Sequence, residues 1–173
     1  MSLQRNALLA CLISALAAGQ SLAQTANPRD AIPDNMPFHV AYGAPISLER
    51  AEGAIAAAVA EAKKRNWPMS IAIVDAGNNL VAFQRMDGAS TSSIAVSQHK
   101  ARAAASFRRE TKIFENALQE GNQPYVATLD GVIAARGGIP LFEGGKIVGA
   151  IGCSGGTGSQ DEVVCKAGAA TVK

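Results

Sequence analysis

Residues 139–152 read Ile-Pro-Leu-Phe-Glu-Gly-Gly-Lys-Ile-Val-Gly-Ala-Ile-Gly, and this stretch decides the fold. Two apolar runs flank the pair Gly144-Gly145, which suits a two-residue hairpin turn because both turn positions need a positive φ. Glu143 and Lys146 would then face each other across the turn. We therefore predict two antiparallel strands at this point of the chain.

A second hairpin is predicted upstream. Residues 69–75 and 80–86 are rich in β-forming side chains, and the turn 76–79 between them (Ala-Gly-Asn-Asn) tolerates positive φ. A further short strand is predicted at residues 132–135. Hairpins take the place of parallel βαβ crossovers, so the order of elements predicts an α+β domain with an antiparallel sheet packed by helices.

Four helices are expected around these strands. The first begins after Ser47, a good N-cap, and the second spans residues 92–109. A short third helix is expected at 111–119, and a capping box at Ser159–Glu162 opens the last one. The second helix has two apolar stripes, which predicts packing on its own sheet and on a neighbouring subunit. Their members are Ile94, Ala101, Ala104 and Ala105 on one, and Val96, Ala103 and Phe107 on the other.

The N-terminal segment has the pattern of an export signal. Arg5 is followed by an uncharged apolar run and by Ser21-Leu22-Ala23, a small-x-small cleavage pattern. The run is too short to span a bilayer, which takes about 20 residues. We predict a cleavable signal peptide at 1–23, an extended arm at 24–45, one domain at 46–173, and a periplasmic or secreted protein without a membrane span.

Composition argues against nucleic acid as a partner and permits one disulfide bond. Sixteen Lys and Arg residues against 14 Asp and Glu give a net charge of +2, and only 5% of residues are aromatic. Nucleic acid is therefore not an expected partner, because its recognition depends on a basic surface and often on stacking. Cys153 and Cys165 follow the signal segment, and an oxidising compartment permits a disulfide between them. The sequence does not show whether the two residues meet.

Several motifs together resemble the GlcG/HbpS family, whose domain also forms the C-terminal half of PduO-type proteins. They are SIAIVDAGNNLVAFQRMDGA (70–89), KARAAASF (100–107), RGGIPLFEGGKIVGAIGCSGGTGSQDE (136–162) and KAGAA (166–170). The resemblance implies a five-stranded antiparallel sheet with helices on both faces, in a profilin-like arrangement. It also implies a homo-oligomer and, for some members, haem binding in haem capture, redox sensing or haem breakdown.

One position departs from that family. Its helix often reads K-A-x-T-A, and the resemblance ties the threonine to haem binding in an exported member. Here the position is occupied by Ala103, so any haem contacts must differ in part.

Haem needs an axial ligand, an apolar slot and cations for its propionates, and histidine is the commonest protein ligand to its iron. His99 lies in the second helix beside Lys100 and close to Arg102, which makes these three the first candidates for a haem site. His39, in the arm, is a second candidate ligand that could reach a shared pocket. Each histidine could equally be a surface residue, and neither has the close partners of a zinc site.

An alternative site would take a small hydroxy- or oxo-carboxylate, for an enzyme or an accessory binding protein. Strand ends and the glycine-rich segment before the last helix carry groups able to line such a pocket. A third hypothesis is a structural oligomer without a ligand, and no catalytic residue is assigned. The candidates for the carboxylate pocket are Asp75, Arg85, Gly137, Gly138, Ser154 and Gly155.

Overall fold

The computed structural model describes residues 32–36 and 38–173. The predicted signal peptide lies outside the described residues. The chain divides into two units, residues 1–36 and 37–173, and every helix and strand named below lies in the second unit. Residues 32–36 form no helix or strand and are exposed.

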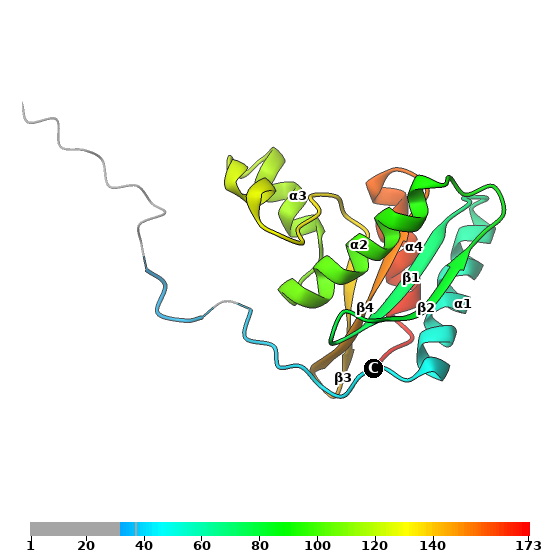
Figure 1. The fold of residues 1–173 in the computed structure, drawn as a ribbon, viewed down its shortest axis with the longest axis horizontal. Helices are drawn as coiled ribbons and strands as arrows, with labels where there is room; N and C mark the ends of the chain where they lie inside the picture. Colours follow the sequence, from blue (N-terminus) through cyan, green and yellow to red (C-terminus); the bar gives the residue numbers. More distant parts are fainter. Residues whose placement is uncertain (1–31, 37) are drawn as a thin grey trace, which may run out of the picture. The chain divides into compact units, whose positions relative to one another are not determined.

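A four-stranded antiparallel sheet forms the centre of residues 37–173, with the order β2-β1-β4-β3 (Figure 1). The predicted 139–152 hairpin is confirmed, with Glu143 opposite Lys146 and positive φ at Gly144 and Gly145. The strands are β1 (Ser70–Asp75), β2 (Leu80–Arg85), β3 (Gly138–Glu143) and β4 (Lys146–Ser154).

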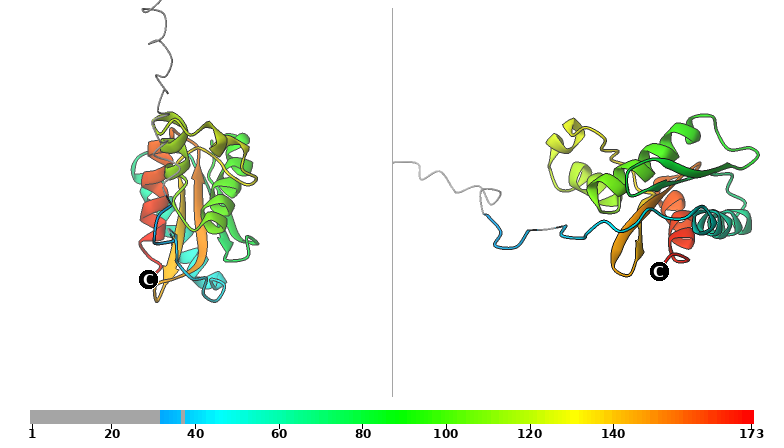
Figure 2. Two further views of the ribbon diagram at one scale, coloured as in Figure 1. Left: turned by 90° about the vertical axis from the view of Figure 1, so that its left-hand side faces the viewer. Right: turned by 60° about the horizontal axis from the view of Figure 1, so that its bottom comes forward.

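Helices cover both faces of this sheet, as Figure 2 shows. Helices α1 and α4 share one face, where a core cluster joins them to β1, β3 and β4. Helix α2 lies on the other face, over a smaller alanine-rich cluster. The helices are α1 (Leu48–Lys64), α2 (Ser92–Phe107), α3 (Lys112–Gln119) and α4 (Gly158–Ala169), and a 3-10 turn, η2 (Pro124–Thr128), follows α3.

Local chemistry explains where α1 begins and ends. The Ser47 hydroxyl accepts a hydrogen bond from the backbone N–H of Arg50 at 3.3 Å, as expected for an N-cap. Asn66 follows the helix with a φ of 56°, a left-handed conformation that asparagine tolerates. The alanine-rich face between these ends is buried against the sheet and α4.

Helix α2 packs directly on the backbone of the sheet. A Cβ added at Gly152 of β4 would lie 2.0 Å from the Ser97 carbonyl oxygen. The glycine is therefore needed because the helix touches the strand there. Ala101, which contacts the same position, and Ala104, both of the first predicted stripe, are fully buried.

The second stripe of α2 is also covered within the chain. Ala103 is 1% exposed, and the ring of Phe107 meets the ring of Phe114 in α3 edge-to-face, with centroids 5.1 Å apart. Val96 is half-buried. Helix α3 thus occupies part of the surface that we expected a neighbouring subunit to cover.

The predicted start of the last helix is wrong by two residues. Thr157 is the N-cap, and it forms the capping box with Gln160, not Ser159 with Glu162. The carboxylate of Glu162 is instead bound by the ammonium of Lys166 at 2.5 Å. Glu162, which the sequence pattern assigned to the capping box, thus forms a salt bridge with Lys166 instead.

The expected fifth strand is absent from the described part of the chain, and residues 132–135 form no strand. Side chains bind the backbone there, since the Thr111 hydroxyl donates to the Ala135 carbonyl at 2.7 Å and the Glu115 carboxylate accepts from the Arg136 N–H at 2.7 Å. The arm provides a partial substitute, because Tyr42 forms an isolated parallel bridge with Ile147 at the start of β4.

No helix among residues 32–36 and 38–173 is both long enough and apolar enough to cross a bilayer.

Candidate functional site

Lys100, a predicted haem contact, lies inside the protein. Its side chain is 3% exposed, and its ammonium lies 2.6 Å from the carboxylate of Asp161 on α4, which is equally buried. Burial raises the pKa of Asp161, while Lys100 and the backbone N–H groups of Gly155 and Gly156 act in the opposite direction. This ion pair connects α2 to α4, so Lys100 is not on the exposed side of α2 that carries His99.

His99 and Arg102 remain on the exposed side of α2. They are three residues apart and therefore share one helix face. The guanidinium of Arg102 donates long hydrogen bonds, both at 3.4 Å, to the Asn78 carbonyl and the Gln98 side chain. These two predicted residues are thus close together, but neither lines the two grooves described below.

Asp75 lies apart from the other residues of the alternative carboxylate pocket, which are at the opposite end of the sheet. Asp75 is at the turn end of β1, where its carboxylate accepts from the N–H groups of Gly77 and Asn79. Arg85 is at the opposite end of the same hairpin, and its guanidinium donates to the Ala89 carbonyl at 2.8 and 3.1 Å. Asp75 and Arg85 therefore stabilise separate turns.

The glycines of that predicted pocket lie where other atoms of the protein leave no room for a side chain. A Cβ at Gly138 would lie 2.3 Å from the Lys100 carbonyl oxygen, and one at Gly155 would lie 2.2 Å from the Pro68 carbonyl oxygen. A Cβ at Gly137 would lie 2.8 Å from that of Asp161. Ser154, at the end of β4, is also buried. Close backbone packing accounts for these positions, so they do not line an open pocket.

Cys153 and Cys165 form a disulfide, with Cα atoms 5.6 Å apart. The bond ties the end of β4 to α4, and both residues are fully buried. Cys153 is therefore not a free thiolate. The sequence permitted this bond but could not show that the strand and the helix meet.

A groove of about 380 Å³ lies between the end of α2, helix α3 and the edge strand β3. Its apolar lining comes from Ile113 of α3 and from three residues of β3, and its cations come from the α2–α3 region. An apolar surface beside several cations suits an amphipathic anion. The apolar strand residues are Ile139, Pro140 and Phe142, the cations are Arg108, Arg109 and Lys112, and the other lining residues are Glu110 and Asn116. Glu110 is paired with Lys166, and Lys112 with Glu162.

Arg108 and Arg109 are the cations of this groove that have no carboxylate partner among the described residues. Neither forms a salt bridge with any carboxylate in the described part of the chain. Burial and the neighbouring charge of Arg108 lower the pKa of Arg109. Two adjacent guanidinium groups without a counter-ion favour an anion at this place.

The N-terminal arm is held on the same two arginines. The guanidinium of Arg109 lies 3.2 Å from the ring centroid of Phe38, and that of Arg108 donates to the Val40 carbonyl at 3.1 Å. The Tyr42 hydroxyl then donates to the Ala105 carbonyl at the end of α2 at 2.9 Å. His39 lies between the two anchored residues and is exposed, which places it beside the groove.

Sequence reasoning missed this groove, although it named His39. The available signal was the pair of arginines directly after an apolar helix. This pair could be interpreted as part of a groove only if β3 was known to lie beside α3. Among the described residues there is no cluster of three or more His, Cys, Asp or Glu side chains that could hold a metal ion.

Residues 46–170 match the family model described as haem degrading protein HbpS-like. The chain belongs to this family. Protein GlcG of Escherichia coli (strain K12) is 43% identical over 109 residues, which cover 63% of this chain and 81% of GlcG. The predicted resemblance to the GlcG/HbpS family is therefore confirmed.

Solved structures of HbpS-like relatives share the fold. A double mutant of HbpS from Streptomyces reticuli has a TM-score of 0.70 at 30% identity, over 83% of this chain and 97% of that one. PduOC, crystallised in complex with heme, has a TM-score of 0.67 at 25% identity, over 75% of this chain and 96% of that one.

Proposed function

We propose that this HbpS-like protein is exported and binds haem at the groove between α2, α3 and β3. One observation carries the proposal, namely that the two arginines without counter-ions line this groove with the apolar strand residues and also hold the arm segment that contains His39. Membership of a haem degrading family and the heme complex of PduOC support the same ligand.

The residues present fit the chemical needs of haem. Ile113, Ile139 and Phe142 offer apolar contact to the porphyrin, and Arg108 and Arg109 would hold the propionates. His39 would offer its imidazole to the iron. When bound, haem would supply iron-centred redox and ligand-binding chemistry, as haem capture, redox sensing or haem breakdown requires.

Three observations bear on export and assembly. The signal pattern at 1–23 predicts passage out of the cytoplasm, and the disulfide suits an oxidising periplasmic or secreted protein. The family resemblance implies a homo-oligomer. Edman sequencing of the exported protein, which we expect to begin at Gln24, and its mass in solution test these points.

A hemin titration followed at the Soret band tests the ligand and the two histidines. We expect wild type and His99→Ala to bind hemin alike, and His39→Ala to lose the band shift. Loss in His99→Ala with retention in His39→Ala would move the site to the exposed face of α2 with Arg102. Absence of any Soret shift in the wild type would refute haem binding.

A second candidate function follows from the same arginines. A small hydroxy- or oxo-carboxylate could pair with Arg108 and Arg109 without using the apolar strand residues. A thermal-shift screen of small carboxylates separates the two ligands. Stabilisation by an acid, with none by hemin, would favour an enzyme or accessory binder over a haem protein.

A further inference from the structure

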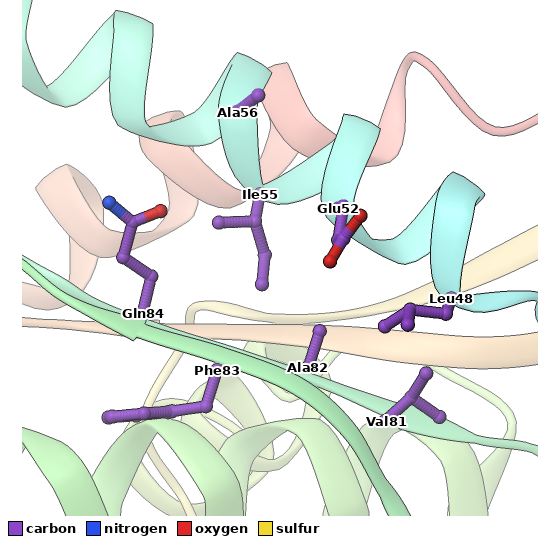
Figure 3. Close-up of a pocket in the computed structure, with 8 residues that line it drawn as sticks. All are labelled: Leu48, Glu52, Ile55, Ala56, Val81, Ala82, Phe83 and Gln84. Carbon is purple, nitrogen blue, oxygen red and sulfur yellow. The ribbon is translucent and has the colours of Figure 1, made fainter.

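A second groove, of about 430 Å³, lies at the opposite edge of the sheet, between α1 and β2 (Figure 3). Leu48 and Ile55 of α1 and Val81 and Ala82 of β2 give it an apolar lining. Figure 3 shows Ile55 pointing from the helix toward the strand and Ala82 pointing from the strand toward the helix. Its volume is that of a site for small ligands or short peptide segments.

Two polar side chains stand at this groove without partners. Glu52 is its one charged lining residue, and Gln84 extends from β2 toward α1 (Figure 3). Neither side chain has a hydrogen bond or ion pair within the described part of the chain. A carboxylate alone at an apolar groove favours a partner that carries a cation.

Strand β2 is an edge strand, paired with β1 on one side only in the described structure. Met86 N–H donates to the Met69 carbonyl, and hydrogen bonds alternate along an antiparallel pair, so Phe83 and Arg85 turn their backbone groups outward. Four consecutive apolar residues, 80–83, lie on this edge without a protecting charge. Such an edge is a ready template for another strand.

We propose that this edge binds an extended basic peptide segment as an added strand. The segment's backbone would pair with the outward groups of β2, and alternate apolar side chains would enter the groove. A Lys or Arg on the same face of the added strand, two residues from an apolar side chain that enters the groove, would meet Glu52. The partner is therefore a β-prone segment with apolar and basic residues alternating on one face.

A second copy of β2 fits this groove less well. An added β2 would need a cation on the side facing α1, but its side chains on that face are Ala82 and Gln84. Arg85 is held by the Ala89 carbonyl. Charge complementarity thus favours a basic peptide over self-pairing.

Fluorescence anisotropy with the labelled peptide acetyl-TVTKTVT-amide tests the proposal on the full chain. This peptide places Val, Lys and Val on one face. We expect saturable binding that is lost when alternate peptide nitrogens are methylated. The twin peptide with Glu in place of Lys should bind more weakly.

Two pairs of variants locate the binding. Ala56→Phe fills the groove and should weaken binding at least tenfold, whereas Ala60→Phe, one turn further along the exposed side of α1, should not. Glu52→Gln should weaken binding about two- to fivefold, as for an exposed ion pair, and Glu49→Gln should leave it unchanged.

Two results would overturn the proposal. The first is no binding, or binding that Ala56→Phe and Ala60→Phe affect equally. The second is a dimer in sedimentation velocity that Ala56→Phe dissociates and the peptide does not displace, which would assign the groove to a second copy. Hemin binding is measured separately, so either proposal can fail alone.

Discussion

The two edges of the sheet carry opposite charges beside similar apolar surfaces. At the β3 edge, Arg108 and Arg109 stand beside a groove partly covered by α3 and the arm. At the β2 edge, the one charged residue that lines the groove is Glu52, and the strand's outer backbone groups are unpaired in the described structure. One sheet thus presents a place for an anionic small molecule and a place for a basic chain.

The difference also extends to the interior. The β3 side is held by the buried pair Lys100–Asp161 and by the disulfide Cys153–Cys165. The β2 side is held by apolar contacts of α1 with Val81 and Ala82. Buried charges and a covalent bond therefore stabilise one half of the sheet, and apolar packing stabilises the other.

The largest expected effect comes from Lys100→Met, which leaves the Asp161 carboxylate buried without its cation. We expect a loss of about 3 to 5 kcal/mol in the free energy of unfolding, measured by urea denaturation. Hydrogen exchange should become faster in β3 and β4 and stay nearly unchanged in β2.

The pH dependence of that loss identifies its cause. Because burial raises the pKa of Asp161 in the folded state, this group's own contribution to stability falls as pH rises through the raised value. Removing Lys100 strengthens this trend, so the variant should recover part of its stability in acid. Adding Asp161→Asn should also restore part of it, and a loss independent of pH would contradict the assignment.

Removing the disulfide should have the next largest effect. Cys153 and Cys165 are 12 residues apart, and closing a loop of about this length contributes about 3 kcal/mol. A Cys153→Ala/Cys165→Ala variant should lose that much in urea denaturation, and dithiothreitol should have no further effect on it. Equal stability of wild type and variant under oxidising conditions would contradict this prediction.

Arg108→Gln/Arg109→Gln should weaken hemin binding about tenfold or more, because the haem propionates would lose their charged hydrogen-bond donors. The matched control is Lys63→Gln/Lys146→Gln, which removes the same charge from exposed positions outside both candidate haem sites. Peptide binding at the β2 edge should be unaffected. Equal losses of hemin affinity in both variants would indicate a general charge effect and no site.

The smallest effect is expected for Arg136→Gln. Burial raises the pKa of Glu115, but hydrogen bonds from the Arg136 side chain and backbone lower it further, to below its ordinary value. This stabilisation is present above the unfolded-state pKa and is lost as pH falls through the folded value. We expect the variant to be about 1 kcal/mol less stable at pH 7, with the difference shrinking toward pH 3. A constant difference would contradict it.

Much of the fold was predictable because its signals are local. The Gly144-Gly145 turn fixed the β3–β4 register, and Ser47 marked the start of α1. The prediction of a fifth strand was wrong because Thr111 and Glu115, distant in sequence, bind the backbone of residues 135–136. Those backbone groups are then not available for hydrogen bonds to a neighbouring strand.

The candidate site was less predictable. His39 and His99 were identifiable by residue type, but burial of Lys100 depends on a contact with Asp161, 61 residues away. The groove depends on α3 lying beside β3, a relation that no periodicity encodes. Glycines 137, 138 and 155 suggested a pocket, whereas the structure packs backbone against them.

The position of the disulfide has a consequence for how the protein matures. After residue 23 the chain has two cysteines, so only one intramolecular pairing exists and oxidation requires no reshuffling of wrong bridges. Both cysteines belong to the last two elements of the chain, β4 and α4. In the export that we propose, the bridge therefore cannot close until α4 has followed β4 out of the cytoplasm, so its oxidation comes after both elements have crossed.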